Sequence, residues 1–146
     1  MARTLVLLKP DGVRRNLLAP VAAMLTREGL RLVGIKMLQL TPERAGEFYA
    51  VHRAREFFGR LTAFMLSGPI VAMVWEGDDA VRRARAVMGA TDWQQALPGT
   101  IRAEFARHQT KNVVHGSDSD ENAAREIVFF FAADELAVVT GGEAEV

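Results

Sequence analysis

The chain has 146 residues, of which 49% are hydrophobic and 25% are charged, and these proportions are typical of one soluble globular domain with a buried core. Lysine plus arginine and aspartate plus glutamate balance at 18 each, so any anion site must be a local feature of the surface. The lack of cysteine excludes disulfides, thiolate metal sites and cysteine nucleophiles, and no apolar run has membrane-spanning length, so we expect a cytoplasmic protein.

The first third of the chain predicts a strand, a helix and a second strand. Residues 5–8 are a continuous apolar run, typical of a central strand, and Lys9 stands where that strand gives way to a loop. Apolar residues at helical spacing predict a helix over about 13–28, which Gly29 ends. A second strand is expected over 30–40.

This second strand is apolar on both of its faces. Alternation places Val33, Ile35 and Met37 on one face, and it places on the other face Leu30, Leu32, Leu38 and Leu40. We therefore expect helices to cover one face and a different element, such as a second subunit, to cover the other.

A helical hairpin is expected next. Thr41 predicts the start of a helix that runs to about residue 52, and a second helix is expected from about 56 or 57 to 66. Tyr49 and His52 lie near the hinge, and such a hairpin suits a mobile lid or one wall of a cleft.

The second half of the chain predicts two further strands and two further helices. A third strand is expected over 70–75, followed by a helix that Asp78 caps and Gly89 ends. Residues 90–111 lose periodicity, which indicates a long irregular segment of the kind that is often functional. A short fourth strand then leads to a last helix capped by Ser119.

This order of elements predicts a single domain over 1–146, with a core over about 3–131 and a C-terminal tail over about 132–146. The fold class is α+β, a ferredoxin-like βαββαβ sandwich with a four-stranded antiparallel sheet and a long loop at the site. We expect all helices to pack on one face of that sheet.

His115 is the candidate for covalent chemistry. It ends the fourth predicted strand, and an imidazole can act as a nucleophile and accept a phosphoryl group. Gly116 would keep the space beside the ring free, and Glu126, about two turns into the next helix, would reach back to orient it. The alternatives are a histidine that only satisfies a turn and a glutamate that faces solvent.

The sequence has neither the G-x-x-x-x-G-K-[ST] loop nor the G-x-G-x-x-G turn that cradle phosphates. Side chains must therefore supply the charge for any nucleotide. The candidates stand at element ends or in the irregular segment, and they are Lys9, Arg85 and Arg102, with the neutral donors Thr91, His52 and Asn112. For Lys9 the alternative is a snorkelling lysine at a strand end, and for Arg85 it is a solvated helix face.

With these residues in place, the chain resembles the nucleoside diphosphate kinase family from Arg3 to about Phe131. The fragments that carry the resemblance are moderately specific alone and highly specific together and in order. They are T-L-V-L-L-K-P-D-G-V at 4–13, F-F at 57–58, S-G-P-I-V-A-M-V-W-E-G at 67–77, G-A-T at 89–91, P-G-T-I-R at 98–102 and N-V-V-H-G-S-D-S at 112–119.

The resemblance implies an enzyme that maintains nucleotide pools. A nucleoside triphosphate, typically ATP, would give its γ-phosphate to a histidine, and the phosphohistidine would then give it to a nucleoside diphosphate in a ping-pong reaction. Carried over by position, His115 would attack through Nδ1, Glu126 would hold the other edge of the ring and Ser117 would lie nearby.

The resemblance also implies a set of nucleotide contacts. Phosphates would meet Lys9, Arg85, Arg102, Thr91 and His52. Phe57 would stack on the base, while Asn112 would join Lys9 at the sugar hydroxyls and the sugar-side phosphate oxygen. Tyr49 would complete the wall near the phosphates and the lysine.

The cofactor implied by the resemblance is Mg²⁺, held mainly by the nucleotide phosphates with Asp118 as the nearest acid rather than by a protein cage. The expected partners are nucleoside triphosphates and diphosphates, together with copies of the chain in dimers that join into tetramers or hexamers. No membrane partner is expected, and nucleic acid is not expected as the main ligand.

The chain departs from the family pattern at four places, in the nucleotide loop, the lid or the subunit-contact loop, and no departure removes a proposed catalytic group. The departures are Glu56, Asp92-Trp93, Ala103-Glu104 and Thr110-Lys111.

Two other functions are weighed against the enzyme. A nucleotide-binding module without turnover would lack the nucleophile or the phosphate arginines. A nucleic-acid-binding domain would place aromatic residues along its central strands, whereas the third predicted strand has only Trp75, at its end.

Overall fold

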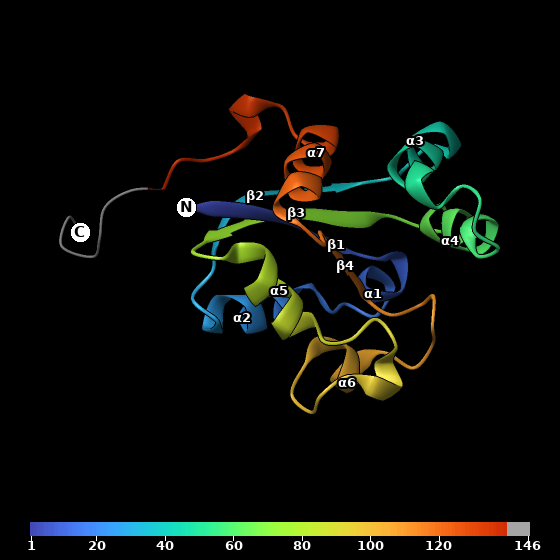
Figure 1. The fold of residues 1–146 in the computed structure, drawn as a ribbon, viewed down its shortest axis with the longest axis horizontal. Coiled ribbons are helices and arrows are strands. Elements are labelled where there is room, and N and C mark those ends of the chain that lie inside the picture. Colours follow the sequence, from blue (N-terminus) through green and yellow to red (C-terminus); the bar gives the residue numbers. More distant parts are fainter. Residues whose placement is uncertain (140–146) are drawn as a thin grey trace.

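A four-stranded antiparallel sheet in the order β2-β3-β1-β4 organises the computed structural model, which describes residues 1–139 (Figure 1). Its strands are β1 Ala2–Leu8, β2 Arg31–Leu38, β3 Ile70–Gly77 and β4 Val114–Gly116. The helices are α1 Pro10–Arg14, α2 Leu18–Arg27, α3 Pro42–Phe48, α4 Phe58–Met65, α5 Ala80–Met88, α6 Ile101–Phe105 and α7 Asp120–Phe130, with 3-10 turns η1 Ala50–His52, η2 Trp93–Gln95 and η3 Ala133–Glu135. The strand order confirms the predicted ferredoxin-like α+β fold.

Helices cover both faces of the sheet, so the expectation of a single covered face is wrong. Side chains of β1 alternate between two cores, with Leu5 and Leu7 in one and Val6 and Leu8 in the other. In Figure 1, α3 and α7 lie above the sheet, α4 lies at its right-hand end, and α1, α2, α5 and α6 lie below it. Strands that are apolar on both faces require this arrangement, because each face must be removed from water.

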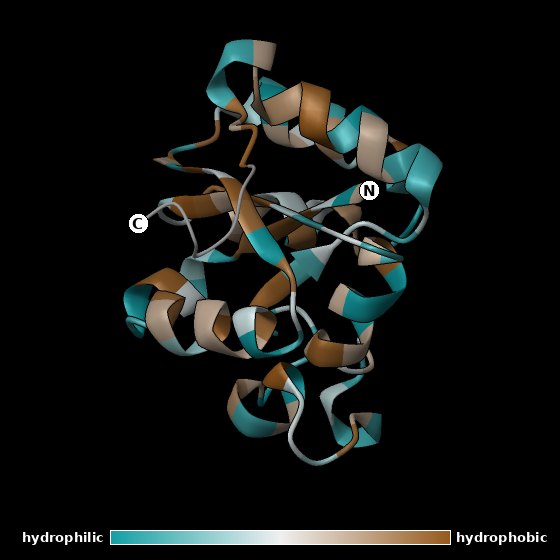
Figure 2. Cartoon of the chain, turned by 90° about the vertical axis from the view of Figure 1, so that its left-hand side faces the viewer, coloured by the Kyte–Doolittle hydropathy of each residue, from teal (hydrophilic) through white to brown (hydrophobic). Residues whose placement is uncertain are grey.

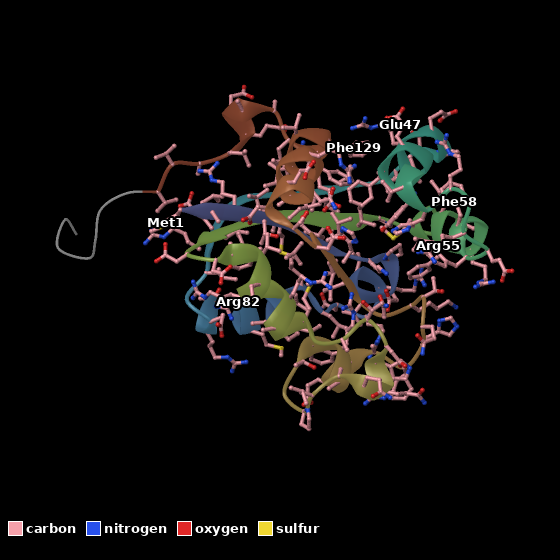
Figure 3. All side chains as sticks on the ribbon, in the orientation of Figure 1. Met1, Glu47, Arg55, Phe58, Arg82 and Phe129 are labelled. Carbon is pink, nitrogen blue, oxygen red and sulfur yellow. The ribbon has the colours of Figure 1, made fainter. Side chains whose placement is uncertain are left out.

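Side chains and hydropathy follow these layers. Figure 3 shows Phe129 and Glu47 above the sheet and Arg82 below it, on α5. Figure 2 shows that the helices on either side carry both hydrophobic and hydrophilic turns, as expected for helices that bury one stripe and expose the other.

A β-bulge changes the predicted faces of β2. The register between β2 and β3 shifts between Leu32 and Gly34, so the simple alternation used for this strand is wrong beyond that point. Val33 consequently joins the core of Leu38 and Leu40, whereas Leu32 packs in the opposite core.

The helix expected over 13–28 is two helices, α1 and α2. Asn16 interrupts it with a positive φ of 60°, a conformation that asparagine tolerates better than most residues. The predicted end is confirmed, since Gly29 follows α2 with φ of 92°.

Two other boundaries differ from expectation. The first helix of the hairpin ends at Phe48 and continues only as η1, although Thr41 caps it as predicted by accepting from the Arg44 N–H. Asp79, not Asp78, occupies the cap position of α5, and its side chain pairs with Arg82.

The segment 90–111 is not wholly irregular, because η2 and α6 lie within it. Each has its own cap: Asp92 accepts from the Gln94 N–H, and Thr100 accepts from the Ala103 N–H. Five helical residues are too few to give a periodic pattern, which is why the sequence does not reveal α6.

The described part of the predicted tail lies along β2. Ala137 N–H donates to the Val33 carbonyl (2.7 Å), and Lys36 pairs with Glu135 (2.8 Å). The rest of that tail, residues 140–146, lies outside the described residues. Among residues 1–139 no helix combines the length and apolar character needed to cross a bilayer.

Candidate active site

His115 lies on β4, opposite Leu7 of β1, and this pairing places its ring on the face covered by α7. Its Nε2 is 3.2 Å from Oε1 of Glu126. The ring packs edge-on against Phe48, with centroids 5.2 Å apart. No hydrogen bond from the described residues reaches Nδ1, so that nitrogen is free to react while the other is held.

Glu126 is fixed from two sides. Ser119 caps α7 by accepting from the Asn122 N–H, and this sets the helix that carries Glu126. Ser117 Oγ donates to Glu126 Oε1 (2.7 Å), the same atom that faces the imidazole. Glu126 is buried, which excludes the solvent-facing alternative.

Hydrogen bonding decides the charge of Glu126. Burial raises the pKa of its carboxyl, but the hydrogen bonds and the charge supplied by His115 and Ser117 outweigh burial and lower that pKa. Glu126 is therefore an anion in the folded protein and can hold a proton on Nε2 of His115.

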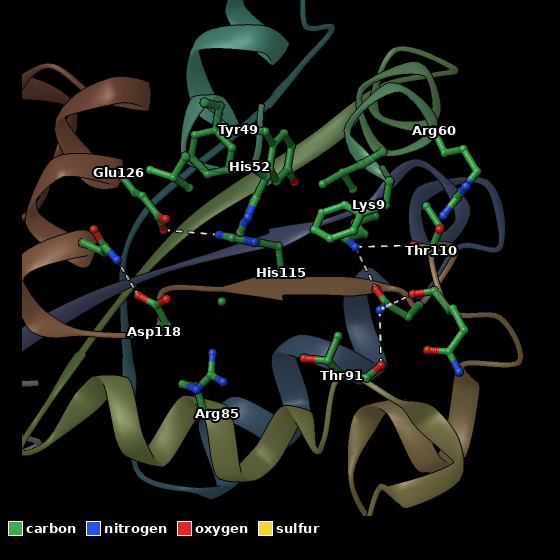
Figure 4. Close-up of a pocket in the computed structure, with 18 of the residues that line it drawn as sticks. Lys9, Tyr49, His52, Arg60, Arg85, Thr91, Thr110, His115, Asp118 and Glu126 are labelled. Carbon is green, nitrogen blue, oxygen red and sulfur yellow. Dashed lines mark hydrogen bonds and ion pairs between the residues drawn. The ribbon is translucent and has the colours of Figure 1, made fainter. Parts of the chain in front are cut away.

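A cavity of about 520 Å³ opens in front of the histidine (Figure 4). Its lining carries more cations than anions. The cavity is therefore a local positive site on a chain whose overall formal charge is neutral. The cations are Lys9, Arg60, Arg85, Arg102 and Arg125, and the anions are Asp118 and Glu126.

Lys9 is a buried cation at the end of β1. Its Nζ donates to Oδ1 of Asn112 (2.8 Å) and to the Thr110 carbonyl (3.4 Å). Burial first, and then the charge of Arg102, lower the pKa of Lys9 to about 7. The snorkelling alternative fails, because the ammonium points into the protein rather than to solvent.

Arg102 and Arg85 differ in how firmly they are held. Arg102 is buried, and its two terminal nitrogens donate to the carbonyls of Gly89 (2.9 Å) and Val114 (2.6 Å). Burial and the charge of Arg85 lower the pKa of Arg102 to about 10. Arg85 is exposed on α5 and lines the cavity, so its guanidinium can meet an incoming anion.

Aromatic side chains from the hairpin form the opposite wall. Tyr49 lies edge-on to His115, with ring centroids 6.0 Å apart, and its buried hydroxyl has no hydrogen-bond partner among the described residues. Burial, with a smaller effect of Glu126, raises the pKa of Tyr49. His52 and Phe57 also line the cavity and are half-buried, with ring centroids 5.4 Å apart.

Asp118 is the second carboxylate that lines the cavity, besides Glu126. It accepts from Nδ2 of Asn122 (2.6 Å), and this hydrogen bond, with a smaller contribution from Arg85, lowers its pKa. Within residues 1–139 no three histidine or acidic side chains gather as a metal cage. One ionised carboxylate beside cationic side chains fits an ion that arrives on phosphates, which is the usual way for proteins to bind Mg²⁺.

One expectation around the histidine is corrected. Gly116 does not mainly clear space beside the ring, because an added Cβ would lie 2.1 Å from Cε of Met88 and so meet α5 instead. Arg125, which follows in α7, lies 3.9 Å from Glu126 Oε2 and lines the cavity.

The residues that the sequence analysis proposed for the site therefore gather around this one cavity. The cavity lining contains Lys9, Tyr49, His52, Phe57, Arg85, Thr91, Arg102, Asn112, His115, Asp118 and Glu126. Ser117 lies behind it, bonded to Glu126. The sequence analysis did not identify Arg60 and Arg125, which also line the cavity. Arg60 stands three residues after Phe57, a predicted site residue, and Arg125 stands three residues after Asn122, which also lines the cavity.

Comparisons with known proteins assign the chain to one family. The family model described as nucleoside diphosphate kinase matches residues 2–136. The nucleoside diphosphate kinase of Bacillus licheniformis is 50% identical over 136 residues, which are 93% of this chain and 92% of that protein.

Two solved structures share the fold. That of the Aquifex aeolicus nucleoside diphosphate kinase has a TM-score of 0.91 and 45% identity, and the match covers 93% of this chain and 99% of that one. That of the Halobacterium salinarum nucleoside diphosphate kinase, in complex with CDP, has a TM-score of 0.91 and 46% identity over 98% of this chain and 95% of that one.

Proposed function

The chain belongs to the nucleoside diphosphate kinase family, and from that premise we propose that His115 is the nucleophile of its reaction. The enzyme moves the γ-phosphate of a nucleoside triphosphate to a nucleoside diphosphate through a phosphohistidine. The observation that carries the assignment of His115 is its ring, held at Nε2 by Glu126 with Nδ1 unengaged in a cationic cavity.

Each half of the reaction balances at this nitrogen. Nδ1 of His115 forms a bond to the γ-phosphorus while the bond from that phosphorus to the β–γ bridging oxygen breaks, and the nucleoside diphosphate leaves. The second diphosphate then attacks the phosphohistidine, and the P–N bond breaks. Glu126 stabilises the positive charge of the imidazole in both directions through the proton on Nε2.

Three cations serve the phosphoryl group. We assign phosphate contacts to Lys9, Arg85 and Arg102, with Thr91 and His52 as neutral donors. Phosphoryl transfer asks mainly for positioning and for charge near the equatorial oxygens, and fixed cations supply both.

The remaining contacts belong to the nucleoside. Phe57 stacks on the base, Asn112 and Lys9 meet the sugar hydroxyls, and Tyr49 forms the wall beside the histidine. Stacking suits an enzyme with broad base tolerance, because every base has a π-face. The cytidine nucleotide in the Halobacterium salinarum relative supports a nucleotide in this cavity.

We propose Mg²⁺ as the metal, held by the nucleotide phosphates with Asp118 nearby. Bound to phosphate oxygens, the ion would neutralise charge that develops during transfer.

The chain is proposed to act as one domain in a homo-oligomer built from dimers. The single sheet shared by residues 1–139 supports one domain. Exposed apolar residues on the edge strand β2, Ile35 and Met37, support a dimer contact there. The cytoplasmic location expected from the sequence stays a prediction.

The labelling of His115 tests the nucleophile. Incubation with γ-labelled ATP and Mg²⁺ is expected to give an acid-labile, base-stable phosphoprotein, and His115→Ala is expected to lose the label because it removes the nitrogen proposed to form the P–N bond. His108→Ala, at an exposed position, serves as the control and keeps the label. A label that survives His115→Ala would refute the assignment.

A further inference from the structure

The residue two positions before His115 has a strained backbone. Val113 has φ of 76°, and the Val114 N–H closes a three-residue turn on the Asn112 carbonyl (2.9 Å). A turn of this kind with positive φ at its centre is rare and strained. A β-branched residue is poorly suited to that conformation, so the surrounding structure must impose it.

Both polar groups of Val113 are held by the turn that follows β1. Its N–H donates to Oδ2 of Asp11 (3.1 Å), and its carbonyl accepts from the Lys9 N–H (2.8 Å). Asp11 is buried, and the carboxylate reaches across a separation of 102 residues rather than to a neighbour in its own helix. The backbone of Gly12 approaches so closely that an added Cβ would lie 3.3 Å from the Val113 carbonyl.

The clamped turn joins two parts of the site. On one side of it, Asn112 points its amide oxygen at Lys9 Nζ (2.8 Å). On the other side, Val114 pairs with Leu8 and begins the strand that carries His115. Rotation of the Val113 backbone would therefore move Asn112 away from Lys9 and shift the histidine within the cavity.

We propose that Asp11 is a positioning residue of the reaction, whose carboxylate holds Val113 in its left-handed conformation and so fixes Asn112 and His115 relative to each other. This inference rests on the proposed function. Asp11 does not line the cavity. Its charge raises the pKa of Lys9 without forming a close ion pair, and burial and Arg102 outweigh that effect, so the direct contact of Asp11 is its hydrogen bond to the Val113 N–H.

Two variants of similar size separate the hydrogen bond from other roles of the side chain. Asp11→Asn keeps an oxygen acceptor, whereas Asp11→Leu fills the same space without one. We expect Asp11→Leu to slow single-turnover phosphorylation of His115, measured by rapid quench with γ-labelled ATP and normalised to folded protein, by about tenfold to a hundredfold. Asp11→Asn is expected to stay within about threefold of the unchanged enzyme, since its acceptor remains.

A second substitution tests whether the backbone of Val113 transmits the effect. Glycine adopts positive φ without strain, so Val113→Gly added to Asp11→Leu is expected to restore at least about half of the lost rate on a logarithmic scale. Val113→Ala is the matched control, because it also removes the buried valine side chain but still disfavours positive φ. Asp11→Ala replaces Asp11→Leu if the leucine variant does not fold.

The outcomes separate this inference from the function on which it rests. If the unchanged enzyme labels His115 but Asp11→Leu labels at the same rate, the positioning role is refuted and the function stands. Equal rates for the glycine and alanine double variants would likewise refute it, because the strain at Val113 would then be irrelevant. If the unchanged enzyme takes no label, the function itself fails.

Discussion

Lys9 is a buried cation beside a second buried cation, Arg102, and the charge of Asp11 offsets these two effects only in part. Its ammonium is bonded to an amide and a carbonyl oxygen rather than to a carboxylate. Burial and Arg102 therefore lower its pKa to about 7. Such a lysine is costly to protonate without a ligand, and the phosphates of a nucleotide would supply the missing negative charge.

The pKa of Lys9 gives a prediction about stability and pH. Because the folded pKa of about 7 lies below the unfolded value of 10.5, the unfolded chain binds more protons between these two values. The free energy of unfolding should therefore rise with pH across that window, by about 1.4 kcal/mol per pH unit relative to Lys9→Met. The full penalty of burying the charge is present below pH 7.

Urea denaturation of both proteins between pH 6 and pH 10, without nucleotide, measures this difference. Lys111→Met, at an exposed position, is the matched control and should run parallel to the unchanged protein. Parallel profiles for Lys9→Met as well would show that the lysine is not desolvated in the fold.

At this scale the sequence predicted which residues gather but not how they are oriented. Lys9, Arg85 and Arg102 were found because each stands at an element end or in the irregular segment, where loops converge. The role of Glu126 stayed open because a helix position alone does not tell which way a side chain faces, and the tertiary contact with Ser117 decides it. Asp11 gave no signal, since its partner Val113 is distant in the chain.

Between elements, the contact of β4 with α5 sets the position of the histidine strand. Gly116 lets Met88 of α5 pack against β4, and an added Cβ would lie 2.8 Å from the Met88 sulfur. The Met88 side chain of α5 therefore packs directly against the backbone of β4 at Gly116, the residue next to His115.

The packing of Gly116 against Met88 gives a prediction about stability. Gly116→Ala is expected to lower the free energy of unfolding by about 1 kcal/mol, at the low end of overpacking costs because methionine is flexible. In a Met88→Ala background the added methyl group has room, and the same substitution should cost nothing. A double-mutant cycle by urea denaturation measures the coupling, and additive effects would contradict the contact.

Long periodic elements were predicted well, and short ones were not. Helices α2, α5 and α7 bury one stripe of their surface, and that stripe is visible as a period in the sequence. Helix α6 has five residues, and the break at Asn16 depends on a single backbone angle, so neither leaves a pattern. The bulge in β2 is likewise invisible, because it changes the strand alternation through one extra residue.

At the scale of the whole molecule, the order of elements along the chain was enough to predict the four-stranded sheet. It was not enough to predict which faces of that sheet the helices cover. The order βαββαβ leaves few ways to pair four strands, so the observed sheet was predicted. That scheme placed the extra hairpin and the last helix on the same face as the other helices, which is wrong. They cover the second face because β1 and β3 are apolar on both sides.

The edge of the sheet carries the last prediction. Strand β2 is an edge strand, and in the described chain the C-terminal segment bonds its backbone only at Val33. Beyond the bulge, Ile35 and Met37 are 48% and 62% exposed. Since long apolar edges invite pairing with another chain, this edge is the expected dimer contact.

A charge on that edge should break the assembly. Met37→Lys places two like charges at a twofold contact, where desolvation and repulsion oppose association, and we expect it to shift the sedimentation coefficient towards that of the monomer. Val128→Lys is the matched control, because Val128 is 76% exposed but lies on helix α7 rather than on the edge strand. If Met37→Lys sediments like the unchanged protein at the same concentration, the oligomer must form through another surface. The exposure of Ile35 and Met37, the apolar residues beyond the bulge in β2, would then need a reason other than assembly.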